Sequence, residues 1–270
     1  MSYIKESRIY YINSRNRISG TDSNFNFQIE FPLGNEFDHV ALMSCIIPKS
    51  YYLIQEGQHT FTLSENTQTV EIVIPIGNYN RPSLASTVET LLNNASPNGL
   101  TYTVTFPISR TEGDTGKYTF TVTNLGINPV LTFGTYVYEN LGFERNSSNH
   151  FTLNAQTNQI ELVSTNVIKL QKEDAIYICS DIVNDSNNIL QEVYSSTNPD
   201  FTHISFYNNN VEAYAKKLNK SGTYNFYITN EDQQPIELNG QNVVFTIILF
   251  KKQNALDLAN AYIKYSLLKK

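Results

Sequence analysis

The chain has no tryptophan, only two cysteines and two methionines, and charged residues make up just 16% of its 270 residues. The cysteines, Cys45 and Cys179, both lie in apolar segments, so we expect buried free thiols rather than a disulfide. No apolar stretch approaches the roughly 20 residues that a membrane-spanning helix needs, and no signal peptide opens the sequence. We therefore expect a protein that is made and folded in a reducing compartment.

Positive charge is too scarce to suggest a nucleic-acid-binding protein. The formal net charge is −6, whereas such a protein would show a basic face. The one basic cluster, Lys216-Lys217-Leu218-Asn219-Lys220, is short and comes before Ser221-Gly222, so we expect a solvated loop there. No specific nucleic acid is expected as a partner.

Residue patterns typical of catalysis or metal binding are missing. His39, His59, His150 and His203 show no spacing that suits zinc, and no Gly-x-Ser-x-Gly motif occurs. Adjacent carboxylates such as Glu231-Asp232 fall in turn sequences, although the sequence leaves open a pair of distant acids that converge on a sugar. We expect no enzyme and assign no catalytic, cofactor-binding or metal-ligating residues.

Aromatic residues are plentiful, and they alternate with polar ones in a way that is typical of β-strands. The chain holds 18 Tyr and 15 Phe. Eight or nine strands are predicted outside residues 60–143, which indicates a β-sandwich or barrel. Their count does not separate a jelly roll from an immunoglobulin-like sandwich. The predicted strands cover 8–13, 25–31, 39–47, 163–170, 175–182, 189–194, 202–207, 224–229 and 243–250.

Residues 60–143 form a self-contained pattern within this series. Two alternating strands precede an amphipathic helix whose apolar positions are Leu84, Val88, Leu91, Leu92 and Ala95. We expect Asn80 to cap this helix, Pro82 to lie in its first turn, and Pro97-Asn98-Gly99 to end it. Further alternating strands follow the helix, so the segment is predicted to be a small α+β unit.

Short motifs on both sides of this segment and within it resemble one family when they are taken in order. The flanking motifs are Tyr11-Ile12-Asn13-Ser14-Arg15-Asn16-Arg17, Ile47-Pro48-Lys49-Ser50-Tyr51-Tyr52 and Asp232-x-x-Pro235-Ile236-x-Leu238-x-Gly240. The internal motifs are Pro75-x-Gly77-Asn78-Tyr79, then Leu84, Val88 and Leu91-Leu92-Asn93, and finally Leu141-Gly142-Phe143. Together they resemble the penton (vertex) capsid proteins of virophages, polinton-like viruses and related large DNA viruses.

This resemblance implies a mainly β fold, a single eight-stranded jelly roll. Residues 1–56 and 145–252 would form the jelly-roll domain. Residues 57–144 would form a ββαββ domain inserted between its third and fourth strands. An even number of antiparallel strands places both termini at one end, so the insertion would leave from the other end and face outward.

The resemblance also implies a structural role in the virion. The chain would form homopentamers that close the fivefold vertices of an icosahedral capsid, next to the major capsid protein, and an internal membrane or a host receptor would be a further partner. The alternative is a virion protein that binds a receptor or glycan through the insertion domain. Exposed Tyr and Asn residues would suit such recognition of sugars.

A second amphipathic helix is predicted over residues 253–270. Leu258, Tyr262, Tyr265 and Leu268 form one stripe, and Lys269-Lys270 end the sequence, where cations favour the helix dipole. Two interpretations are open. The helix packs on its own sandwich, or it is an arm that docks on a neighbouring capsid protein or an internal membrane.

Overall fold

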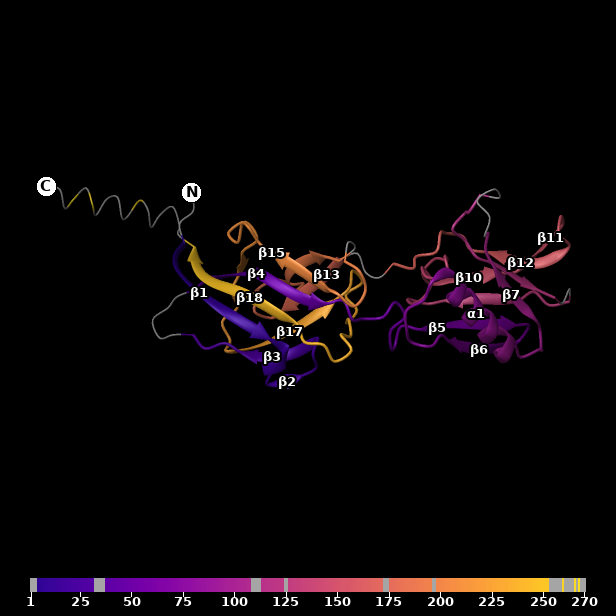
Figure 1. Cartoon of the computed structure of the whole chain (residues 1–270), viewed down its shortest axis with the longest axis horizontal. Helices are drawn as coiled ribbons and strands as arrows, with labels where there is room; N and C mark the ends of the chain where they lie inside the picture. Colours follow the sequence, from indigo (N-terminus) through magenta and orange to yellow (C-terminus); the bar gives the residue numbers. More distant parts are fainter. Residues whose placement is uncertain are drawn as a thin grey trace. The chain divides into compact units, whose positions relative to one another are not determined.

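A computed structural model describes residues 4–31, 37–107, 113–123, 126–171, 175–195 and 198–252, together with three single residues further on. The chain is mainly β, as expected from its alternating pattern (Figure 1). It divides into two compact units. The first unit comprises Met1–Tyr51 and Glu173–Lys270, and the second comprises Tyr52–Lys172.

Two antiparallel sheets build the first unit. Each sheet mixes strands from before and after the second unit. The first sheet runs in the order β1 (Ile4–Asn13), β18 (Val244–Lys252), β4 (His39–Pro48) and β15 (His203–Tyr207), and β16 (Lys216–Lys217) also pairs with β4. The second sheet runs in the order β14 (Ile189–Tyr194), β13 (Ala175–Ser180), β17 (Thr223–Thr229), β3 (Asn24–Gln28) and β2 (Ser19–Gly20).

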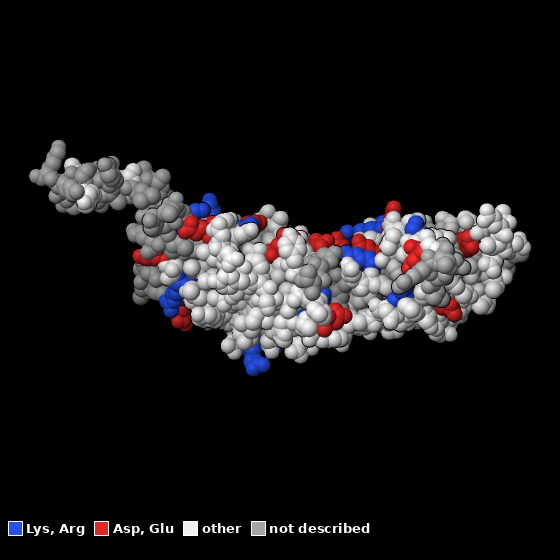
Figure 2. Space-filling model, turned by 45° about the horizontal axis from the view of Figure 1, so that its top comes forward, with Lys and Arg blue, Asp and Glu red and all other residues white. Residues whose placement is uncertain are grey.

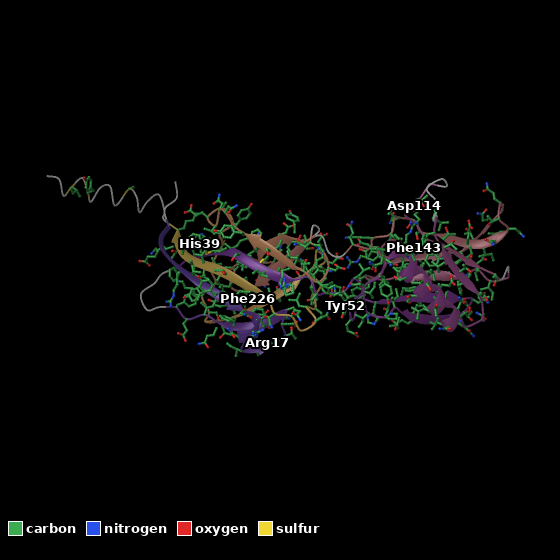
Figure 3. The ribbon with its side chains drawn as sticks, in the orientation of Figure 1. Arg17, His39, Tyr52, Asp114, Phe143 and Phe226 are labelled. Carbon is green, nitrogen blue, oxygen red and sulfur yellow. The ribbon has the colours of Figure 1, made fainter. Side chains whose placement is uncertain are left out.

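One hydrophobic core lies between these two sheets. Phe25 and Phe226 come from the second sheet, Phe245 comes from the first, and the three rings lie 5.1–6.2 Å apart. All three side chains are almost fully buried, and the backbone around the labelled Phe226 can be followed in Figure 3. Since aromatic side chains bury the largest apolar areas, this trio is a major contributor to the attraction between the sheets. The first unit is therefore a two-layer sandwich.

The pairing of β1 with β18 fixes where the chain's ends lie in the first unit. Ile4 pairs with Lys252 at one end of the sheet, whereas Asn13 pairs with Val244 at the other. Val244 pairs in turn with Ile46, near the last residue of β4. The chain therefore leaves β4 for the second unit at the end opposite to Ile4 and Lys252. We call this the exit end.

The second unit also contains two four-stranded antiparallel sheets, and one core connects them with a helix. The first sheet runs in the order β10 (Ser147–His150), β9 (Val130–Phe133), β5 (Thr60–Glu65) and β6 (Gln68–Val73). The second runs in the order β11 (Thr152–Asn154), β12 (Gln159–Val163), β8 (Thr119–Val122) and β7 (Tyr102–Thr105).

The predicted helix forms as α1 (Arg81–Ala95), with Asn80 as its N-cap and Pro82 in its first turn, as expected. The Asn80 side chain accepts a hydrogen bond from the Ser83 backbone amide, and the Ser83 hydroxyl accepts one from the Asn80 amide. This reciprocal pair satisfies two donors that the first helical turn would otherwise leave open. The buried face carries Leu84, Ala85, Val88 and Leu92, which confirms most of the predicted stripe.

Three expectations about the strands need correction. Residues 163–170 do not form a strand of the sandwich, because β12 ends at Val163 and pairs with β8 of the second unit. The insertion was expected to end at residue 144, but strands β10, β11 and β12 lie beyond that residue and pair with strands of the second unit. Ile160 and Leu162 alternate into the second core, and an alternating pattern does not reveal which sheet a strand joins. The cluster at 216–220 begins with β16 rather than a loop.

The expected C-terminal helix over 253–270 lies outside the described residues, apart from three single positions. The two interpretations of this segment therefore remain predictions.

A buried carboxylate holds the end of α1 in place. Glu65, at the end of β5, is fully buried, and its Oε1 accepts hydrogen bonds from the Ser96 hydroxyl at 2.7 Å and the Tyr102 hydroxyl at 2.6 Å. Its Oε2 accepts a third from the Asn98 amide at 2.9 Å. Burial raises the pKa of Tyr102, and the neighbouring Glu65 raises it further, so this hydroxyl remains a donor. The three donors fix the turn that ends the helix.

We predict that Glu65→Gln lowers the free energy of unfolding by about 1–3 kcal/mol, because the amide group replaces an acceptor with a donor and leaves buried donors unpaired. Chemical denaturation followed by far-ultraviolet circular dichroism measures the change. Glu71→Gln on the exposed face of β6 is the matched control, with an expected change within about 0.5 kcal/mol. Equal effects of the two substitutions would contradict the assigned role.

Candidate functional site

The motif at the end of β4 closes the exit end through a buried lysine. The Lys49 residue is 5% exposed, and its Nζ donates hydrogen bonds to the carbonyl oxygens of Ser195 at 3.0 Å and Asn198 at 2.6 Å. The Lys49 backbone also pairs with Thr202 and Phe201. These contacts attach the end of β4 to the segment that connects β14 with β15. The buried ammonium group therefore links these two segments of the first unit by hydrogen bonds, a contact that we call the Lys49 brace.

The three flanking motifs, which are far apart in the sequence, meet at this same end. The Ser50 hydroxyl donates to the Leu238 carbonyl at 2.6 Å, and the Asn239 side chain donates to the Ser50 carbonyl at 2.7 Å. The Ser14 hydroxyl accepts from the Val243 amide at 3.0 Å, so the first motif joins the segment that follows the third. The residues that carried the resemblance therefore hold the place where the chain leaves the sandwich.

Within the second unit, the motif around Gly77 holds the first residues of that unit. The backbones of Ile54 and Gly77 exchange two hydrogen bonds, at 3.0 and 3.1 Å. The Asn78 side chain accepts from the Leu53 amide at 3.0 Å, and the Tyr79 hydroxyl donates to the Pro75 carbonyl at 2.6 Å. The segment after Tyr52, which is labelled in Figure 3, is thus anchored as soon as it enters the second unit.

The motif Leu141-Gly142-Phe143 holds the last part of the second unit. Phe143 stacks on Phe133 with ring centroids 4.7 Å apart, and Leu141 is fully buried. Gly142 has φ +76°, and a Cβ there would meet the Asn166 carbonyl oxygen at 2.5 Å, so only glycine fits. The Gly142 carbonyl accepts from the Asn166 amide at 2.8 Å. The returning segment therefore lies directly against this motif.

The groups that could carry chemistry are dispersed. His39 Nδ1 lies 2.7 Å from an Asp38 carboxylate oxygen, and its ring stacks on Phe250, while His59 Nδ1 lies 3.1 Å from the Gln55 carbonyl oxygen. Within the described ranges, no three His, Cys, Asp or Glu side chains come together as a metal site requires. The helices in that part of the chain are also too short or too polar to cross a bilayer.

The two thiols are free and buried, which confirms the expectation from sequence. Burial raises the pKa of Cys45 to about 12 and that of Cys179 to about 11. Both side chains therefore remain protonated at neutral pH, and neither has the low-pKa thiolate that nucleophilic chemistry needs.

Charged side chains are sparse on the surface, as the composition indicates. On the face shown in Figure 2, lysine, arginine and acidic residues are scattered among wide uncharged areas. One well-formed ion pair joins Arg81 to Asp114 at 2.7 Å in the second unit, and its hydrogen bonds hold the pKa of Asp114 below its usual value. Such a surface suits contacts based on shape and apolar side chains more than on charge.

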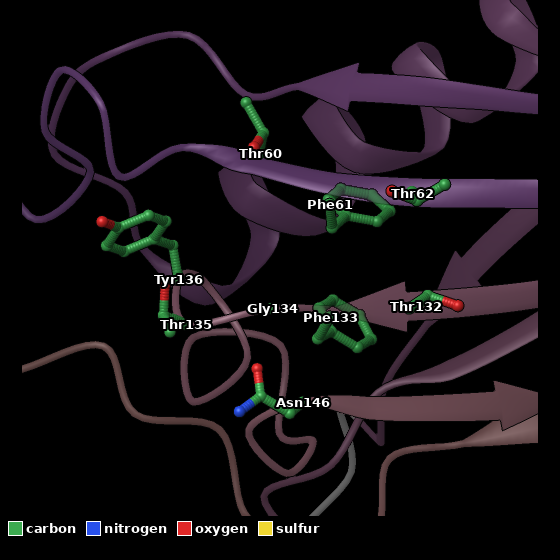
Figure 4. Close-up of a pocket in the computed structure, with 9 residues that line it drawn as sticks. All are labelled: Thr60, Phe61, Thr62, Thr132, Phe133, Gly134, Thr135, Tyr136 and Asn146. Carbon is green, nitrogen blue, oxygen red and sulfur yellow. The ribbon is translucent and has the colours of Figure 1, made fainter.

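A hollow with both polar and apolar lining lies on the second unit, where β5 and β9 run side by side (Figure 4). Its volume is about 520 Å³. Thr60, Thr62, Thr132, Tyr136 and Asn146 contribute hydroxyl and amide groups around it. These groups can hydrogen-bond a polar ligand, and a tyrosine ring offers an apolar surface.

Sequence reasoning missed Glu65, the bonding of Lys49 and this hollow. Glu65 carried a usable signal, because it follows Phe61 and Leu63 on the inward side of an alternating strand. Lys49 carried none, since its partners are backbone carbonyls more than 140 residues later. The hollow depends on the pairing of β5 with β9, which alternation alone does not specify.

No family model matches the chain, and neither does any curated protein. Among solved structures, it is similar to the crystal structure of the mavirus penton protein, with 11% identity over 92% of this chain and 100% of that one and a TM-score of 0.47. It is also similar to a chain in the cryo-EM structure of the Sputnik virophage, with 11% identity over 91% and 98% and a TM-score of 0.40. At this identity, functional conclusions rest on the residues of this chain itself.

We predict that Lys49→Met destabilises the first unit by about 1–3 kcal/mol, because the carbonyls of Ser195 and Asn198 lose a buried donor. Urea denaturation followed by circular dichroism measures the loss. Lys220→Met removes an exposed lysine from the same unit and is expected to change stability by less than about 0.5 kcal/mol. A Lys49→Met protein as stable as the Lys220→Met protein would show that the ammonium group does not brace the exit end.

Proposed function

We propose that this chain is a structural capsid protein, a penton subunit that forms homopentamers at the fivefold vertices of an icosahedral shell. The observation that carries the proposal is the strand order of the first unit. Its eight main strands, numbered along the chain, form one sheet in the order 1-8-3-6 and another in the order 5-4-7-2. We interpret this order as that of an eight-stranded jelly roll with two Greek keys, a fold that recurs in viral capsids, and this supports the proposal.

The position of the second unit in the chain supports an outward-facing insertion. This unit follows the third main strand and precedes the fourth. The chain leaves at the exit end, opposite to the paired residues Ile4 and Lys252. We propose that the exit end faces out of the shell, and that the end with the termini faces inward. Residues 253–270 would then lie beside the major capsid protein or an internal membrane.

The location of the family motifs supports the same proposal. Five of them bind together the segments at which the chain leaves and rejoins each unit, including Ser50 with Leu238 and Gly142 with Asn166. These motifs hold segments of the chain together and do not assemble a reactive centre, as expected for a protein whose role is structural. We accordingly propose a role in the virion without catalytic turnover or a cofactor.

A second candidate function is attachment to a host glycan through the second unit. The hollow at β5 and β9 favours it, because threonine hydroxyls, an asparagine amide and the Tyr136 ring suit the hydroxyls and faces of a sugar. This role is compatible with a position at the vertex, and the hollow identifies the residues that it would use.

We predict that a cryo-EM reconstruction of purified particles places density for this chain at the fivefold vertices, with five copies in each ring. Antibody labelling against the second unit should mark the outside of intact particles. Density at other lattice positions, or absence of the chain from particles, would contradict the capsid role. Density within particles but away from the vertices, together with glycan-array binding that Tyr136→Ala abolishes, would instead favour the second candidate.

A further inference from the structure

The outer face of the first sheet in the first unit carries an uncharged ridge. Tyr11, Thr246, Ser44 and Tyr207 form one row across the four strands, since each residue pairs with the next. Asn13, Val244, Ile46 and Ser205 form the adjacent row towards the exit end. Neither row contains a charge. Tyr11 is 77% exposed and Tyr207 is 69% exposed, so both rings stand free of the sheet.

The ridge is unusual because its apolar members are contiguous. Val244 and Ile46 are 37% and 47% exposed and lie directly opposite each other. Scattered exposed hydrophobic residues are ordinary, but a contiguous patch marks a contact surface. Exposed tyrosine with flanking aliphatic residues is the composition found at the centre of protein–protein interfaces.

The outer face of the opposite sheet carries a hollow. Its volume is about 310 Å³, and Tyr177, Cys179, Ile189 and Tyr227 line it along the strand pairs of β14, β13 and β17. Cys179 is only 3% exposed, so the hollow narrows towards a small apolar side chain between two tyrosines. The two outer faces of the sandwich thus differ, since one presents exposed tyrosines and the other contains a hollow.

The ridge and the hollow both lie near the exit end of the first unit. Tyr11 is two residues from Asn13, the last residue of β1 at the exit end. Tyr177 is two residues from Ala175, which pairs with Tyr194 beside the Lys49 brace, also at the exit end. Rotation about an axis parallel to the strands leaves both surfaces towards this end. In a ring of upright subunits, the ridge of one copy and the hollow of its neighbour therefore both lie towards the same end of the ring.

Charge around the two surfaces is complementary. Arg15 is exposed just beyond Asn13, next to the ridge. Glu231 is exposed at the rim of the hollow, and Glu192 lies beside Tyr177. Burial raises the pKa of Tyr177, and Glu192 and Glu231 raise it further, which indicates a negative potential there. A positive edge thus accompanies the ridge and a negative rim accompanies the hollow.

We infer that the ridge around Tyr11 on one copy of this chain seats in the Tyr177–Tyr227 hollow of the next copy. This interface is heterologous, with two different faces of the same subunit in contact, as a closed ring requires. The inference rests on the proposed ring assembly and adds to it the two surfaces that touch. Arg15 of one copy then lies near Glu231 of its neighbour.

The test replaces Tyr11 with the photo-cross-linking residue p-benzoylphenylalanine, which the exposed position accommodates. Isotopically labelled and unlabelled chains are mixed, so that mass spectrometry separates cross-links between copies from those within one copy. Both purified particles and the concentrated protein alone are irradiated. We expect inter-copy cross-links from position 11 to the peptides that carry Tyr177 or Tyr227. Tyr214, 55% exposed in the same unit, takes the same substitution as a control and should not reach these peptides.

Cross-links from position 11 to another protein, to other segments of this chain, or to nothing in either sample would overturn the inference. If the chain is at the vertices and position 11 still misses the hollow, the capsid role stands and only this interface is wrong. If the chain is absent from particles, the capsid role fails. Cross-linking in the concentrated protein then decides whether the ridge and the hollow meet between copies.

Discussion

The buried ammonium group of Lys49 is the contact on which the arrangement of this chain depends. It joins the end of β4 to the segment after β14 at the one end where the chain leaves the sandwich. A unit of more than 100 residues follows Tyr51, so no short turn connects the two parts of the sandwich. The places where the chain leaves and re-enters the sandwich therefore need other contacts that hold them in position. Hydrogen bonds from one buried cation to two backbone carbonyls supply that constraint.

Hydrogen bonds also hold the other joints, by which we mean the places where the chain enters or leaves a unit. Ser50 and Asn239 tie the exit to the segment before β18, Ile54 pairs with Gly77, and Gly142 receives the segment around Asn166. Each joint uses backbone groups and short side chains, and short side chains lose less conformational entropy than long ones when they are ordered. These contacts lie at the places where the chain enters or leaves a unit, whereas two adjacent rows on the outer face of the first sheet carry no charge. This is the surface that a subunit of a closed assembly needs.

The sequence was most informative where the pattern is local. The α1 helix, its Asn80 cap and the strands β4, β14 and β17 follow from periodicity and turn residues within a few positions. The sequence pattern did not predict which strands pair when they are far apart along the chain. Ile160 and Leu162 alternate as well as any strand of the sandwich, yet they belong to the other core because of their pairing with Val122 and Phe120. The ridge and the hollow arise only after eight strands are placed in order, so single-strand patterns do not contain them.

The two sheets of the first unit enclose a core of their own, so we expect this unit to fold, and its exit end to close, without the second unit. Replacing residues 52–172 by a flexible Gly/Ser linker of about ten residues, which spans roughly 17 Å, tests it directly. Circular dichroism during thermal unfolding is the measurement. We expect a β-rich chain that unfolds in one cooperative transition and is destabilised by Lys49→Met as the intact protein is. An excised chain with no cooperative transition would contradict it.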